Sequence, residues 1–151
     1  MPETEPKTKP KLARIDHVGI ACPDLDKKIA FYREVFGLAV VSLETNEEQG
    51  VREAMLQFPL QSPAAPSYVQ LLEPLGPDTP VGRFLAKRGE GLHHVGYAVQ
   101  DITAALASVG AAGVKRIDER PRHGSMGAAI AFLHPAAIGG VLTELVEPPG
   151  P

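Results

Sequence analysis

The chain has 151 residues, of which 44% are hydrophobic and 22% are charged, and its formal net charge is −3. These values are ordinary for one compact soluble domain, and the slightly acidic balance argues against nucleic acid as the main partner. No apolar run approaches the roughly 20 residues that a membrane-spanning helix needs. The single cysteine, Cys22, excludes an internal disulfide framework and favours a reducing, cytoplasmic location.

Residues 1–11 are rich in Pro, Glu, Lys and Thr, and they are predicted to form a disordered tail. Apolar periodicity then changes several times along a first module, about 12–75. The pattern predicts a strand, a helix and three further strands, over 15–21, 26–36, 38–43, 51–58 and 68–72. Asp24 is suited to begin the helix and Gly37 to end it.

A short helix over 81–87 is predicted between this module and a second one, about 91–148, which repeats the same order. The predicted elements are a strand over 94–99, a helix over 102–109, and strands over 114–117, 128–133 and 141–147, with a polar loop over 121–127. A unit of roughly 60 residues has too little core to be stable alone. We therefore expect an α+β fold, a single domain over 12–148 in which two tandem βαβββ modules form a curved mixed sheet around a metal-binding cleft.

The two modules contain similar segments, and each segment carries a histidine at the same place. Ile15-Asp16-His17-Val18-Gly19-Ile20-Ala21 resembles Leu92-His93-His94-Val95-Gly96-Tyr97-Ala98, and Val69-Gln70-Leu71 resembles Thr143-Glu144-Leu145. His17 therefore pairs with His94, and Gln70 with Glu144. Side chains two apart in a strand share a face, so small residues leave space beside each imidazole. The opposite faces of these strands, with Val18, Ile20, Val95, Tyr97 and Val99, are expected to pack under the helices.

Two imidazoles, an amide and a carboxylate at equivalent inward positions indicate a metal site. This donor set suits cobalt, nickel, zinc or manganese, and two waters would complete an octahedron. The other histidines are expected to have no role in the metal site: His123 and His134 lie in loops, and His93 lies at the surface or at a rim. Glu73 and Glu147 lie on the opposite face from the ligands, and we expect them to cap the strand ends.

Several segments of the chain are similar to those of a known family, and together they extend over nearly the whole chain outside the tail. They include Ile15-Asp16-His17-Val18, Asn46-Glu47-Glu48-Gln49-Gly50-Val51, Tyr68-Val69-Gln70, Gly91-Leu92-His93-His94-Val95, His134-Pro135 and Val141-Leu142-Thr143-Glu144-Leu145. On these residues the chain resembles the methylmalonyl-CoA epimerase family of the vicinal oxygen chelate superfamily. The resemblance implies a divalent metal, cobalt before nickel, zinc or manganese, held by His17, Gln70, His94 and Glu144, with Glu48 and Glu144 as two bases.

The implied reaction interconverts (2R)- and (2S)-methylmalonyl-CoA through an enolate. One base removes the C2 proton, and a second base on the other face returns one. Because the 122–127 loop is rich in hydrogen-bond donors, we expect Ser125 to contact the substrate carboxylate. A homodimer is also expected, since short exposed strands tend to pair.

Three alternatives share this fold. A glyoxalase I-type lactoylglutathione lyase uses similar proton-transfer chemistry, but many members carry an acidic residue where this chain has Gln70. An extradiol dioxygenase would use a His-His-Glu triad with iron, and the amide ligand argues against it. A non-catalytic protein that binds a small molecule would not need four ligands.

Overall fold

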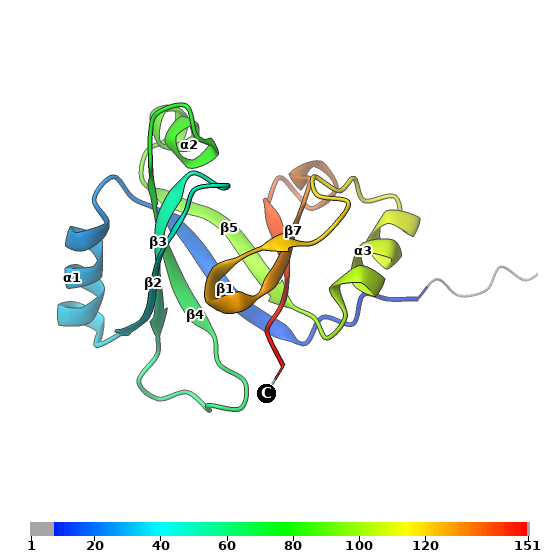
Figure 1. Cartoon of the computed structure of the whole chain (residues 1–151), viewed down its shortest axis with the longest axis horizontal. Helices are drawn as coiled ribbons and strands as arrows, with labels where there is room; N and C mark the ends of the chain where they lie inside the picture. Colours follow the sequence, from blue (N-terminus) through cyan, green and yellow to red (C-terminus); the bar gives the residue numbers. More distant parts are fainter. Residues whose placement is uncertain (1–7, 151) are drawn as a thin grey trace, which may run out of the picture.

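The computed structural model describes residues 8–150 and forms one curled, mixed sheet of eight strands with three α-helices (Figure 1). The order of the strands across the sheet is β2-β3-β4-β1-β5-β8-β7-β6. The first strands of the two modules, β1 and β5, are antiparallel neighbours at the centre. Each is flanked by the parallel last strand of its own module. The predicted α+β fold with a curved mixed sheet is confirmed.

The elements of the first module are β1 (Arg14–Ala21), α1 (Leu25–Phe36), β2 (Ala39–Asn46), β3 (Val51–Gln57) and β4 (Tyr68–Pro74). Helix α2 (Pro80–Arg88) connects the modules. The second module contains β5 (Gly91–Ala98), α3 (Ile102–Ala111), β6 (Arg122–His123), β7 (Ala129–Leu133) and β8 (Thr143–Glu147). Two short 3-10 turns, η1 (Ser125–Gly127) and η2 (Pro135–Ala137), flank β7.

The strand predicted over 114–117 is wrong. That segment makes only an isolated bridge, between Arg116 and Leu133, and the strand that pairs with the outer edge of β7 is β6, inside the predicted polar loop. Backbone hydrogen bonds still join this segment to the end of β7, but Asp118 interrupts the ladder, because its Oδ2 accepts a hydrogen bond of 2.9 Å from the backbone N–H of Phe132. A side chain thus occupies a place in the ladder that a backbone carbonyl would fill.

Carboxylates begin both long helices in the same way. Asp24 and Asp101 are the N-caps of α1 and α3, and their Oδ1 atoms accept from backbone N–H groups three residues later. Glu73 accepts from the N–H of Leu25 at 2.7 Å, and Glu147 accepts from that of Ile102 at 3.0 Å. These two glutamates therefore satisfy helix N-termini rather than strand ends, because β4 and β8 end beside the helices.

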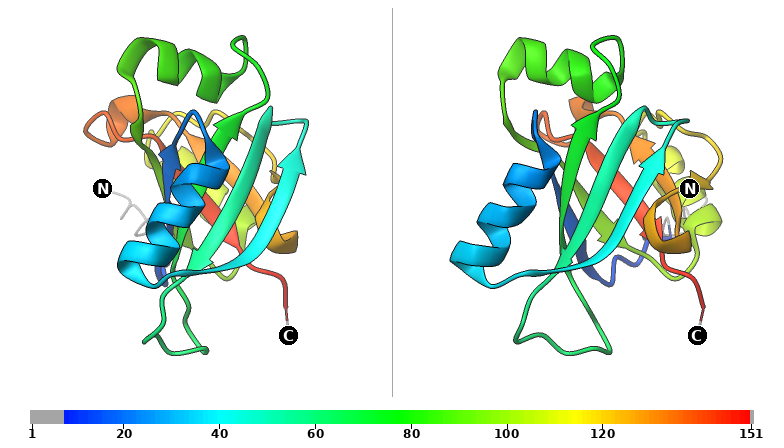
Figure 2. Two further views of the ribbon diagram at one scale, coloured as in Figure 1. Left: turned by 90° about the vertical axis from the view of Figure 1, so that its left-hand side faces the viewer. Right: turned by 60° about the vertical axis from the view of Figure 1, so that its left-hand side comes forward.

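The hydrophobic core is divided between the two modules. Helix α1 packs on β3 and β4, and α3 packs on β7 and β8, so that the helices lie apart on the outside of the sheet (Figures 1 and 2). The outer face of β1 and β5 lies between them. The prediction that this face packs under the helices is confirmed in part. Val18 and Ile20 pack against the core cluster of α1, and Val99 belongs to that of α3. Val95 and Tyr97 are half-buried and belong to neither cluster.

Only part of the predicted tail can be compared with the structure. Residues 1–7 lie outside the described residues, and residues 8–11 have no regular secondary structure. The carbonyl of Thr8 accepts a hydrogen bond from the Ser108 hydroxyl on α3. Over residues 8–150, none of the helices is long and apolar enough to cross a membrane.

Candidate active site

The register of the four central strands arranges the predicted ligands in two rows. The rows are Gln70, Gly19 and His94, and Glu144, Gly96 and His17. Each row contains an oxygen-bearing residue and a glycine from one module and a histidine from the other. The repeat in the sequence therefore becomes a local twofold arrangement in space, with β1 and β5 exchanging their histidines.

The central glycine of each row makes room for the histidine beside it. A β-carbon built on Gly19 would lie 2.2 Å from Cε1 of His94, and one on Gly96 would lie 2.4 Å from Cε1 of His17. Such distances are far inside van der Waals contact, so any side chain at either position would displace the ring. The predicted open space beside each imidazole is present, but it is the other module's histidine that fills it.

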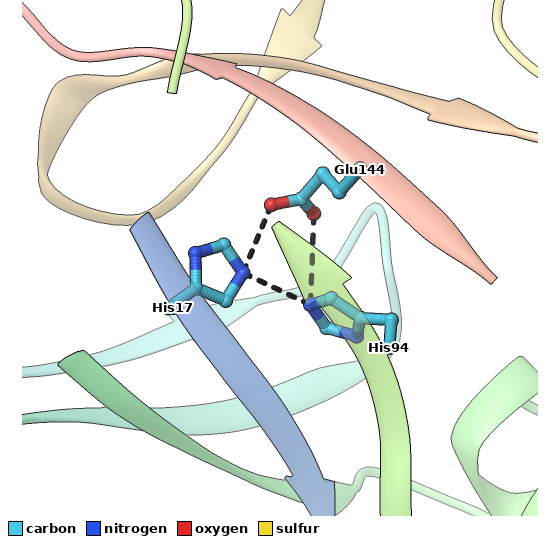
Figure 3. Close-up of side chains that lie close together, drawn as sticks. All are labelled: His17, His94 and Glu144. Carbon is cyan, nitrogen blue, oxygen red and sulfur yellow. Dashed lines mark hydrogen bonds and ion pairs between the residues drawn. The ribbon is translucent and has the colours of Figure 1, made fainter. Parts of the chain in front are cut away.

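Three predicted ligands point toward one another, as Figure 3 shows. The Nε2 atom of His17 lies 3.0 Å from Nε2 of His94 and 3.0 Å from Oε1 of Glu144. Nε2 of His94 is 3.9 Å from Oε2 of Glu144. All three residues are buried, and a cluster of this kind can hold a metal ion.

Gln70 completes the arrangement through its unsatisfied oxygen. Its Nε2 donates to Oε2 of Glu53 at 3.1 Å and to Oγ of Ser125 at 3.2 Å. Its Oε1, among the side-chain atoms of the described residues, is the one buried polar atom without a hydrogen-bond partner. An orphaned carbonyl oxygen in a buried site calls for a partner, and a hard or borderline cation is one that suits an amide oxygen. The donor set thus fits a divalent metal.

The two central histidines are electrostatically unequal. Burial lowers the pKa of His17, but the negative charge of Glu144 and the hydrogen bonds to Asp16 and Glu144 outweigh it and raise that pKa to about 10. Burial, with the positive charges of His17 and His93, holds the pKa of His94 well below its usual value. A proton on His17 and a metal ion would compete for the same lone pair.

Each central histidine also contacts the residue immediately before it. The Nδ1 of His17 lies 2.8 Å from Oδ2 of Asp16, and the Nδ1 of His94 lies 2.9 Å from Nδ1 of His93. His93 is half-buried, packs against Phe84 and lines the cavity. Burial lowers the pKa of His93 to about 4. Asp16 is the residue that the repeat makes equivalent to His93.

A cavity of about 440 Å³ opens over the site, and its wall comes from both modules. All four predicted ligands line it, together with Glu48, Glu53 and Ser125. Apolar side chains supply much of the remainder, among them Met55, Leu72, Val81, Ile130, Phe132 and Val146. The cavity can therefore surround a small acyl group next to the polar cluster.

Two glutamates of the β2–β3 hairpin differ in their surroundings. Glu48 lies at the turn, its side chain is 60% exposed, and its Oε1 pairs with Nε of Arg122 at 2.8 Å. Glu53 is 3% exposed, hydrogen bonds to Gln70, and accepts a hydrogen bond from the Ser125 hydroxyl. Burial raises the pKa of Glu53, against the hydrogen bond from Ser125.

Glu53 was missed from the sequence although a signal for it exists. In β3 it shares a face with Val51 and Met55, which also line the cavity. A carboxylate between two inward apolar residues breaks the alternation, and a buried charge needs a reason. Ser125, which was predicted to contact the substrate, lies in the cavity wall next to Glu53.

Residues 16–132 match the model of the Glyoxalase/Bleomycin resistance protein/Dioxygenase superfamily. The chain belongs to this superfamily. Mouse mitochondrial methylmalonyl-CoA epimerase is 36% identical over 138 residues, which are 91% of this chain and 74% of the mouse protein. The ethylmalonyl-CoA/methylmalonyl-CoA epimerase of Cereibacter sphaeroides is 35% identical over 138 residues, 90% of this chain and 98% of that protein.

Solved structures give closer matches. A variant of Streptomyces coelicolor methylmalonyl-CoA epimerase in complex with 2-nitronate-propionyl-CoA is 50% identical, with a TM-score of 0.89, and the match covers 93% of this chain and 100% of that one. Three variants of this epimerase change a glutamate, a glutamine 17 residues later and a serine 55 residues after that. Glu53, Gln70 and Ser125 have the same spacing.

Proposed function

We propose that this protein is a metal-dependent methylmalonyl-CoA epimerase, which interconverts the (2R) and (2S) thioesters by moving a proton at C2. One observation carries the proposal. Two buried carboxylates, Glu53 from the first module and Glu144 from the second, line the same cavity beside the ligand set. Inversion at a carbon acid needs a base on each of two faces, and these two carboxylates come from different modules.

The metal would be held by His17, Gln70, His94 and Glu144. Cobalt is our first choice, with nickel, zinc and manganese as alternatives, because two nitrogens and two oxygens suit borderline divalent ions. The ion would supply Lewis-acid stabilisation of the negative charge that develops on the thioester oxygen. The orphaned Oε1 of Gln70 and the close Nε2 atoms of the two histidines support this ligand set.

We propose Glu53 as the second base, in the place that the sequence had suggested for Glu48. A base must reach the C2 proton, and Glu53 lies in the buried part of the cavity, whereas Glu48 is mostly exposed and paired with Arg122. Its raised pKa allows Glu53 to take up a proton nearer neutral pH than an ordinary glutamate. Gln70 and Ser125 fix both of its oxygens, so the carboxylate is already oriented.

The proton transfer then follows from the positions of the two carboxylates. In one direction Glu53 removes the C2 proton and protonated Glu144 delivers a proton to the opposite face; in the other direction the roles reverse. Glu144 would bind the metal through one oxygen and use the other as the base. Ser125 lies in the cavity wall, and its single hydroxyl hydrogen is donated to Glu53, so a hydrogen bond to the substrate carboxylate would require this hydroxyl to turn from Glu53 to the substrate.

A homodimer is part of the proposal. The outer face of β1 and β5 is central in the sheet but lies between α1 and α3, with Ile15 49% and Leu92 57% exposed. A second copy of this chain would bury that face. Sedimentation equilibrium should give a dimer, and Leu92→Asp should shift it to a monomer. The lone, buried Cys22 supports a reducing, cytoplasmic location.

Proton NMR of methylmalonyl-CoA in deuterated water tests the function. With catalytic amounts of metal-loaded protein, the C2 proton should disappear and the methyl doublet should collapse, and a chelator should abolish both changes. A coupled assay with a stereospecific mutase would then measure inversion. If a fully metal-loaded protein catalyses no exchange, the epimerase proposal fails, and a glutathione thiohemiacetal becomes the next substrate to assay.

A further inference from the structure

The residue before each central histidine occupies an equivalent place in the repeat but differs in chemistry. Asp16 and His93 stand at the same position of β1 and β5, and each contacts the Nδ1 of the following histidine. Asp16 is buried, and a second contact, to Arg14 at 3.5 Å, holds its other oxygen. His93 is held edge-on against Phe84, with ring centroids 4.9 Å apart.

These contacts decide which ring nitrogen of each histidine carries hydrogen. An ionised carboxylate only accepts, so Asp16 holds the hydrogen on Nδ1 of His17, and Nε2 is the nitrogen left to bind a metal. Between His93 and His94 the two Nδ1 atoms must share one hydrogen. If His93 supplied it, a neutral His94 would carry its own hydrogen on Nε2 and could not bind a metal there. Ligation by His94 therefore requires His93 to accept.

We propose that Asp16 and His93 are positioning residues, each of which fixes the tautomer and ring orientation of the metal ligand that follows it. The inference rests on the proposed metal site. It also predicts an asymmetry between the modules, because a carboxylate is a stronger acceptor than an imidazole and makes its partner a more basic ligand. Loss of Asp16 should therefore weaken metal binding more than loss of His93.

The experiment measures Co²⁺ affinity by competition with a chromophoric chelator, together with the visible absorption spectrum of bound cobalt. Asp16→Ala should weaken binding by about 10- to 100-fold, as outer-shell changes typically do, and Asp16→Asn by less, since its amide oxygen still accepts. His93→Phe keeps a ring against Phe84 but removes the acceptor, and it should weaken binding about tenfold and alter the cobalt spectrum. His93→Asn restores an acceptor at the place of Nδ1 and should recover most of the affinity.

Two controls separate positioning from damage to the fold. His134→Phe changes a histidine outside the cavity lining and should leave Co²⁺ binding unchanged. Thermal unfolding of each metal-free variant shows whether the fold persists. The inference is overturned if folded His93→Phe binds Co²⁺ like the wild type with the same spectrum, or if His93→Asn is as weak as His93→Phe. Failure of the wild type to bind Co²⁺ would instead remove the metal site itself, and the inference with it.

Discussion

Gly96 on β5 lies directly opposite His17 on β1, and the imidazole of His17 occupies the space in which a β-carbon of Gly96 would lie. We predict that Gly96→Ala displaces His17, lowers metal affinity at least tenfold and destabilises the fold by about 1–3 kcal/mol, the usual cost of overpacking. Metal analysis after dialysis and thermal unfolding measure the two effects. Gly76→Ala is the matched control, because nothing lies within 4 Å of a β-carbon built there. Equal metal content in both variants would contradict the prediction.

Glu53→Gln and Glu48→Gln form a matched pair on one hairpin. We expect Glu53→Gln to lower the rate of epimerisation by about 100-fold or more, since general-base catalysis contributes about that much, while metal content stays unchanged. Glu48→Gln should remain within a few-fold of the wild type, because its ion pair with Arg122 is largely exposed. Steady-state rates on both stereoisomers provide the measurement. The reverse ranking would assign the second base to Glu48.

The stability of the metal-free protein should depend on Glu53 in a predictable direction. Its pKa is raised above 4.5 in the folded state by burial, so the folded state holds this proton more tightly than the unfolded state. Its contribution to stability is therefore fully present below about pH 4.5 and is lost as the pH rises through the folded pKa. Relative to the wild type, Glu53→Gln should gain stability between acidic and neutral pH. Urea unfolding at several pH values checks this, and a pH-independent difference would refute it.

Metal binding should release a proton. The pKa of His17 is about 10, so at neutral pH this ring is protonated and must lose its proton to become a ligand. Affinity for Co²⁺ should therefore increase about tenfold with each unit of rising pH, until the pH reaches that pKa. Calorimetric titration in buffers of different ionisation enthalpy counts the protons directly, and we expect about one per ion from this residue. A count of zero at neutral pH would show that His17 is already neutral.

The repeat in the sequence was sufficient to pair His17 with His94 and Gln70 with Glu144, because a duplicated strand preserves which face a side chain occupies. It could not show that each histidine lies over the glycine of the other module, since that depends on the register between β1 and β5. The segment 114–117 has strand propensity, yet the side chain of Asp118 takes the backbone's place against β7. Glu48 was assigned as a base in place of Glu53 because the family resemblance rests on the segment from Asn46 to Val51, which ends before Glu53.

Neither module alone forms a complete row of the site, because β1 and β5 each place their histidine in the row of the other module. Each row takes its imidazole from the opposite module, so a bound ion would act as a cross-link between the two halves of the chain. Its binding free energy would then oppose separation of the modules and would raise the stability of the whole domain with metal concentration, rather than that of one local segment. Metal binding and cooperative unfolding would then both depend on the pairing of β1 with β5.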